Sequence, residues 1–190
     1  TFKWEDVRDL PRDQWPVGRY YTVRYHRPEA DEIDIDIVLH GEGPGAAFGQ
    51  RARPGDVVAI WGPRLAYEPA DDIGDVLMVA DQTGLPAVGA ILDAARPGVR
   101  YHAILDVPGP AEAVLETSAD ATITWFYGEG ELLPAAARAA IAELPVEGLY
   151  VWGACEASVA KDLRSLFEEE RGLAGKRVSI LAYWNRDGRH

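Results

Sequence analysis

The spacing of apolar residues changes near residue 70, and the change divides the chain into two parts of different structural class. Beyond residue 74, apolar runs of strand length alternate with segments of helical periodicity. The pattern predicts strands at 75–81, 99–107, 121–127, 148–154 and 177–184, with helices at 85–95, 133–144 and 158–171. Because this alternation is typical of right-handed β-α-β units, we expect a parallel sheet.

The first third of the chain is instead rich in strands with the spacing of hairpins. Residues 17–26 combine aromatic and β-branched types, residues 33–37 alternate apolar and acidic side chains within a strand at 33–39, and residues 57–61 form a third apolar run. A short helix is predicted near 45–52, and a polar linker at 67–74. We therefore expect an α/β protein, with part of an antiparallel barrel in residues 1–70 and a parallel-sheet nucleotide-binding domain in residues 71–190.

The net charge of the chain limits the classes of partner that it can bind. The 190 residues carry a formal net charge of −12, and an acidic surface repels polyanions, which excludes a general nucleic-acid binder. Residues 171–190 are the exception, because five basic side chains there face one acidic side chain. Such a basic end either attracts an anionic small ligand or is simply solvated.

Cysteine content and hydropathy bear on the compartment. One cysteine allows no internal disulfide and fits a reducing environment. No apolar run approaches the ~20 residues of a membrane span, and the first residues lack the layout of a signal peptide. We therefore expect a cytoplasmic protein with no integral membrane segment. The missing initiator methionine leads us to expect a piece of a longer protein.

Two segments of the first part have residues suited to a phosphate-bearing ligand. The strand at 19–24 supplies Arg19, Tyr21 and Thr22, which suit an anionic, planar, hydrogen-bonding molecule, although cross-strand packing explains the same pattern. A glycine-rich loop then leads into the predicted helix, where backbone N–H groups can meet phosphate oxygens. The loop residues of interest are His40, Gly43, Gly45, Ala46 and Ala47.

In the second part, the candidate residues lie where predicted strands end. One group follows the strand at 75–81 and another ends the strand at 148–154, and ligands of open α/β sheets bind at such carboxyl ends. The residues are Asp81, Thr83, Gly84, Pro86, Trp152, Ala154, Cys155 and Glu156. The alternatives are a helix cap and a tight turn for Asp81 and Thr83, and buried packing for Cys155. No histidine pair has the spacing of metal ligands, so we expect no protein-bound metal.

Together these pieces resemble one family. The motifs that carry the resemblance are Arg19-x-Tyr21-Thr22-x-Arg24, His40-Gly41, Gly62-Pro63, 81–87, Trp152-x-Ala154-x-Glu156 and Tyr183-Trp184, in this order. They closely resemble the siderophore-interacting proteins, flavin-dependent ferric-siderophore reductases of the ferredoxin-reductase superfamily, over nearly all of the chain. The resemblance implies a flavin-binding antiparallel barrel, here its C-terminal part, followed by an NAD(P)H-binding α/β domain.

The resemblance also implies roles for individual residues. Arg19 would contact the flavin phosphate, Tyr21 would pack on the isoalloxazine ring, Thr22 would reach its N5 edge, and the backbone of 43–47 would hold the FAD pyrophosphate, with His40 in the same loop. The turn at 81–87 and the segment 152–156 would line the nicotinamide nucleotide site, and Trp184 and Arg186 would bind substrate. The chain departs from the usual family pattern at Gln82, Gly84, Ala47, Cys155 and Arg186, the last shifted by one position.

The expected activity is reduction of a ferric siderophore, with electrons from NAD(P)H passing through FAD to release Fe(II). No protein acid or base is required for this chemistry. The acidic Asp106, at the end of the second α/β strand, favours NADH over NADPH. The family has more barrel strands before Arg19 than this chain provides, so weak flavin binding is expected. Alternatives are a nucleotide-binding or interaction module that has lost the flavin, and a ferredoxin-dependent reductase. A monomer is favoured.

Overall fold

The computed structural model describes residues 7–11, 15, 17–39, 43–128, 130–173 and 175–186. They belong to two compact units, one within 1–21 and 36–64, the other within 22–35 and 65–190. The predicted domain boundary near residue 70 stays a prediction. In neither unit do the described helices have the length and apolar character that a membrane crossing needs.

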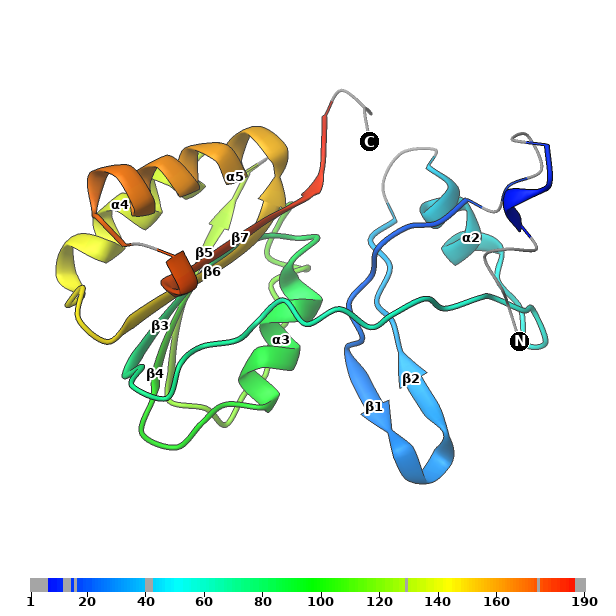
Figure 1. The fold of residues 1–190 in the computed structure, drawn as a ribbon, viewed down its shortest axis with the longest axis horizontal. Coiled ribbons are helices and arrows are strands. Elements are labelled where there is room, and N and C mark those ends of the chain that lie inside the picture. Colours follow the sequence, from blue (N-terminus) through cyan, green and yellow to red (C-terminus); the bar gives the residue numbers. More distant parts are fainter. Residues whose placement is uncertain are drawn as a thin grey trace. The chain divides into compact units, whose positions relative to one another are not determined.

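A five-stranded parallel sheet forms the centre of the second unit (Figure 1). Its strands are β3 (Asp75–Asp81), β4 (Arg100–Val107), β5 (Ala121–Tyr127), β6 (Leu149–Glu156) and β7 (Val178–Trp184). They lie in the order β5-β4-β3-β6-β7, which confirms the predicted parallel sheet. The chain order reverses between β3 and β6, so the crevice at their carboxyl ends is the topological switch point where such sheets bind ligands.

Helices cover both faces of this sheet (Figure 1). On one face α3 (Leu85–Asp93) packs its apolar residues against β3, β4 and β6. On the other face α4 (Leu133–Glu143) and α5 (Ala157–Arg164) pack on β3 and β6. Every residue of β3 and β6 is buried, as expected for central strands with both faces covered.

The helix predicted at 158–171 does not stay α-helical. After α5, residues Ser165–Glu170 form a π-helical segment, η3, closed by a hydrogen bond from Arg171 N to Leu166 O at 3.1 Å. Within this wider turn, the neighbouring residues Leu166 and Phe167 are both buried in the core. A short 3₁₀ turn, η4 (Gly175–Arg177), then leads into β7.

The strands predicted in the first third are wrong over most of their length. Among the described residues of this third, only β1 (Tyr25–Arg27) and β2 (Glu32–Asp34) form, as an antiparallel hairpin closed by the 3₁₀ turn η2 (Pro28–Ala30). Residues 57–61 form no strand, and Val57 and Trp61 are 94% and 71% exposed. The physical reason is that a strand needs a partner for its ladder of hydrogen bonds, and the described residues provide one only at this hairpin.

The first unit contains α2 (Pro44–Arg51), which confirms the helix predicted near 45–52. Proline occupies its first turn, where its missing N–H costs no hydrogen bond. Ala46 is buried, and Gly49 lies close to the side chains of Ile37 and Leu39. Because Gly49 of α2 has no side chain, the segment 37–39 can approach this helix closely.

Candidate functional site

Asp81 ends β3 at the switch point, and its carboxylate joins three segments of the second unit. Its Oδ1 accepts hydrogen bonds from the backbone N and the hydroxyl of Thr83, at 2.8 and 2.6 Å. Its Oδ2 accepts hydrogen bonds from the backbone N of Glu156 at 2.9 Å and from Nε1 of Trp184 at 2.8 Å. Four donors thus hold a carboxylate that is only 7% exposed.

Glu156 has the matching position at the end of β6, where it is the N-cap of α5. Its Oε2 accepts hydrogen bonds from the backbone N of Ser158 at 2.6 Å and of Val159 at 3.4 Å, and from the Ser158 hydroxyl. Its Oε1 accepts a hydrogen bond from the backbone N of Arg186 at 3.2 Å. Although burial alone would raise the pKa of Glu156, these hydrogen bonds hold it below its ordinary value.

Gly84 brings the first turn of α3 against the end of β6. A Cβ on Gly84 would lie 2.7 Å from the carbonyl oxygen of Ala154 and 2.8 Å from the Cβ of Ala80. Pro86 and Trp152 are also buried, and Nε1 of Trp152 donates a hydrogen bond to the carbonyl of Ala66 at 3.2 Å. These predicted site residues are therefore packed into the core at the carboxyl ends of β3 and β6.

Cys155 is fully buried between the two carboxylates. Burial first, and then the charges of Asp81 and Glu156, raise the pKa of its thiol to about 12. A thiol that stays protonated is a poor nucleophile. This supports the packing interpretation of Cys155.

The role expected of Asp106 in coenzyme choice needs correction. Its side chain is 2% exposed, and its two oxygens accept hydrogen bonds from the backbone N of Gly128 at 2.7 Å and of Gly130 at 2.9 Å. Both oxygens are therefore used to fix the loop between β5 and α4. The sign of this charge gives no physical reason to prefer NADH.

In the first unit, the start of α2 is shaped like a phosphate cradle. Gly43 caps α2 without a side-chain hydrogen bond, and a Cβ on Gly43 would meet no atom within 4 Å. Ala47 N donates to Gly43 O at 2.9 Å. Since the first N–H groups of a helix have no partner within it, this open, glycine-rich start fits the diphosphate of a dinucleotide.

Tyr21 lies beside the start of α2, and a Cβ on Gly45 would overlap its hydroxyl. Arg19 is exposed, with Nη1 donating to the carbonyl of Gly18 at 2.8 Å. The structure thus brings Tyr21 against Gly45 in the first turn of α2, and the roles of these residues in flavin binding stay predictions. His40 lies outside the described residues.

Thr22 belongs to the second unit, where its side chain hydrogen-bonds Tyr183 near the end of β7. Arg24, two residues after Thr22, pairs with Asp93, and its guanidinium lies against α3 where Gly89 leaves room. Neither contact was predicted from the sequence, and nor was the hydrogen bond between Ser158 and Glu156. The serine two residues after Glu156, at the start of a predicted helix, is the signal that could have indicated the cap.

The described residues hold no group of three or more side chains arranged to bind a metal ion. The carboxyl edge of the sheet instead holds two hydrogen-bonded carboxylates, the starts of α3 and α5, and the Trp184 indole, which donates to Asp81. Such an arrangement binds and orients a polar ligand.

Two family models match the chain. Residues 73–187 match the model described as siderophore-interacting protein, and residues 1–67 match the siderophore-interacting FAD-binding domain. Together they leave only 68–72 and the last three residues unmatched.

Similar proteins agree with these matches. A protein of Mycobacterium bovis, named only as uncharacterized, is 35% identical over 96% of this chain and 70% of its own length. The ferric acinetobactin reductase of Acinetobacter baumannii is 31% identical over 94% of this chain and 64% of that protein. The NADPH-dependent ferric-chelate reductase of Escherichia coli is 29% identical over 90% and 69%. Among solved structures, the siderophore-interacting protein SipS of Aeromonas hydrophila is 33% identical, with a TM-score of 0.77 over 93% of this chain and 77% of that one.

Proposed function

Because this chain belongs to the siderophore-interacting protein family, we propose that it reduces ferric siderophores with electrons from NAD(P)H that pass through FAD. The names of two relatives support the reaction, since one is a ferric acinetobactin reductase and the other an NADPH-dependent ferric-chelate reductase. The observation that carries the proposal is the hydrogen bond from Trp184 to Asp81, which joins two strand ends at the carboxyl edge of the sheet. It occurs in a chain whose first 67 residues match an FAD-binding domain.

The first unit would hold the flavin. The backbone at Gly43–Ala47 binds the pyrophosphate, Arg19 supplies a positive charge to phosphate, and Tyr21 offers its ring as a packing surface. Thr22, which belongs to the second unit, and His40 remain predictions from the family resemblance. FAD supplies the conversion of a two-electron hydride donor into single-electron transfers, while the chain supplies position and charge.

The carboxyl edge of the parallel sheet would hold the nicotinamide nucleotide. Asp81 orients Thr83 and the start of α3, and Glu156 fixes the start of α5, so the residues facing the crevice are held in place before the ligand arrives. The inner side of this proposed site would consist of the buried residues Gly84, Pro86, Trp152 and Ala154.

The substrate is iron(III) enclosed in a siderophore, and reduction weakens its binding. Iron(II) carries less charge than iron(III), so hard oxygen ligands hold it less tightly and it can leave the chelate. Trp184 and Arg186, at the end of β7, are the proposed contacts to the siderophore; the hydrogen bonds to Asp81 and Glu156 fix their backbone and indole positions. A cytoplasmic location and a monomer remain predictions.

The test is anaerobic reduction of a ferric siderophore by the purified protein, with NADH, NADPH or chemically reduced ferredoxin as donor and a ferrous-specific chelator as indicator. We expect a flavin-bound protein that forms Fe(II) with NADH or NADPH. Activity with ferredoxin alone would identify the ferredoxin-dependent alternative. A protein without flavin and without activity after FAD is added would contradict the proposal and favour the binding module.

A further inference from the structure

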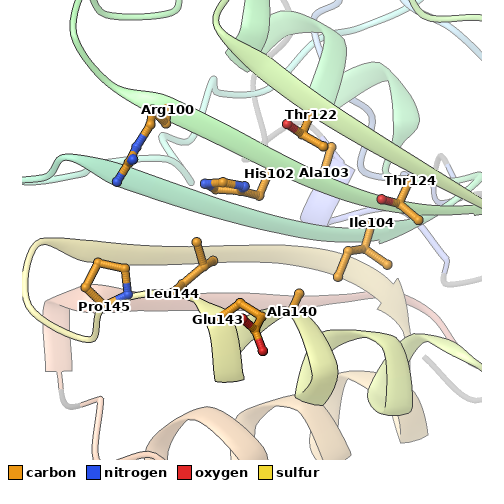
Figure 2. A pocket seen from close by; sticks show the side chains of 10 residues that line it. All are labelled: Arg100, His102, Ala103, Ile104, Thr122, Thr124, Ala140, Glu143, Leu144 and Pro145. Atoms are coloured by element: carbon orange, nitrogen blue, oxygen red, sulfur yellow. The ribbon is translucent and has the colours of Figure 1, made fainter.

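A hollow of about 510 Å³ lies between the β4–β5 edge of the sheet and the C-terminal end of α4 (Figure 2). Its wall comes from the amino-terminal half of β4, from Thr122 and Thr124 of β5, and from Ala140, Glu143, Leu144 and Pro145. The proposed nucleotide site lies at the opposite, carboxyl edge of the sheet, where β3 and β6 end. The hollow is therefore separate from the proposed reaction site.

A buried carboxylate organises the polar end of the hollow. Asp75 is 4% exposed, with Oδ2 accepting a hydrogen bond from Nη2 of Arg100 at 2.7 Å and Oδ1 lying 3.0 Å from Nε2 of His102. Burial alone would raise the pKa of Asp75, but these two partners hold it below its ordinary value, so the carboxylate stays charged. Asp75 thus fixes both side chains at the edge of the hollow.

Arg100 keeps donors for a ligand. A guanidinium has five N–H groups, and Asp75 engages one nitrogen of Arg100, whose side chain is 60% exposed. His102 also lines the hollow (Figure 2), and Nε2 is the ring nitrogen that lies beside Asp75. A ligand would therefore meet a fixed guanidinium fork beside an imidazole.

The rest of the wall suits an apolar body. Ile104, Ala140 and Leu144 supply apolar surface across the hollow (Figure 2). Thr122 and Thr124 are in register with His102 and Ile104, so their side chains lie on the same face of the sheet. Their hydroxyls provide polar contacts along one side of this surface.

We propose that this hollow binds a small monocarboxylate with an apolar body, its carboxylate paired with Arg100. A carboxylate matches the planar fork of a guanidinium. Because Asp75 neutralises the charge of Arg100 and Glu143 is acidic at the rim, a singly charged anion is repelled less here than a phosphate dianion would be. The volume lies in the range of small-molecule sites.

The test uses the flavin-loaded protein and three probes that share a phenyl ring: benzoate, the uncharged benzyl alcohol and phenyl phosphate. Binding is followed by ¹H–¹⁵N NMR titration, and ferric-chelate reduction is measured in parallel as an independent check on the catalytic edge. We expect benzoate alone to shift the amide signals of 100–104 and 122–124. Equal binding of benzyl alcohol, or tighter binding of phenyl phosphate, would overturn the assignment.

Two variants with opposite expected effects on benzoate affinity test which charged side chain the carboxylate meets. Arg100→Gln should weaken benzoate binding by about tenfold, the effect of losing one charge-assisted hydrogen bond, whereas Glu143→Gln should leave it unchanged or tighten it. Arg138→Gln is the matched control, because its side chain is 58% exposed on the same helix as Glu143 and pairs with Glu170 instead. If Arg100→Gln does not fold, Glu143→Gln still decides, since weaker benzoate binding in that variant contradicts an anionic ligand.

Discussion

Nε1 of Trp184 donates a hydrogen bond to Oδ2 of Asp81 at 2.8 Å, which joins the end of β7 to the end of β3 across the intervening strand β6. The same oxygen accepts the backbone N–H of Glu156, the last residue of β6. One buried carboxylate oxygen therefore aligns the ends of three strands at the switch point.

The first prediction concerns this carboxylate. Asp81→Ala leaves the Glu156 N–H and the Trp184 indole without their acceptor, and we expect a loss of about 2–3 kcal/mol in the free energy of unfolding. Trp184→Phe removes one donor and should cost about 1 kcal/mol. Urea denaturation of both single variants and the double variant measures the coupling. Strict additivity would mean that the hydrogen bond contributes nothing.

The second prediction concerns the close approach of α3 to β6. Gly84→Ala places a methyl group 2.7 Å from the Ala154 carbonyl oxygen, and such overpacking costs about 1–3 kcal/mol. Gly74→Ala is the control, because a Cβ there meets no atom within 4 Å. We expect a lower thermal unfolding midpoint for Gly84→Ala than for Gly74→Ala. Equal midpoints would show that α3 and β6 move apart at little cost in free energy.

The third prediction concerns pH. The pKa of Glu156 lies below its ordinary value of 4.5 in the folded protein. Its stabilising contribution is therefore complete above pH 4.5 and is lost as the pH falls through the lower, folded pKa. Glu156→Gln should show a shallower loss of unfolding free energy between about pH 5 and pH 3. The exposed Glu147, changed to Gln, should leave the wild-type slope intact.

The fourth prediction concerns the single thiol. Cys155 has a pKa raised to about 12 and is fully buried, so iodoacetamide should alkylate it slowly in the native protein at pH 8 and rapidly in urea. Mass spectrometry of the intact protein gives both rates. Fast labelling in the native state would contradict the packing role of this cysteine.

The fifth prediction concerns the proposed flavin site. Gly45→Ala forces the Tyr21 hydroxyl away from α2, and we expect about tenfold weaker FAD binding, measured by flavin fluorescence during titration of the apoprotein. Adding Tyr21→Phe should restore much of the affinity, because the next ring atom, Cζ, lies at 3.1 Å. Gly18→Ala, where a Cβ has open space, is the control. No rescue by the double variant would place the flavin elsewhere.

The sequence predicted the parallel sheet well and the first third poorly. Runs such as 75–81 and 121–127 are strands at the predicted bounds, because their apolar or alternating patterns and flanking turns both favour strands locally. The run at 57–61 is also apolar and contains β-branched residues but forms no strand, because its outcome depends on a partner that periodicity cannot identify.

The sequence predicted the region of the site but not the contacts between its residues. The rule of carboxyl ends predicted the region of Asp81 and Glu156, yet nothing in their spacing indicated that Asp81 binds Trp184, 103 residues later. Asp75, Arg100 and His102 were missed for the same reason, since only the parallel register of β3 and β4 places them on one face.

The obstacle beside Gly84 is a main-chain oxygen, and this limits how the protein can vary. No substitution at position 154 removes its backbone carbonyl group. A smaller residue at position 154 therefore cannot compensate for a larger residue at position 84. Only a displacement of an entire strand or helix would make room. In proteins of this kind that carry alanine at the corresponding position, we therefore expect these two elements to stand farther apart, which would alter the gap offered to a coenzyme.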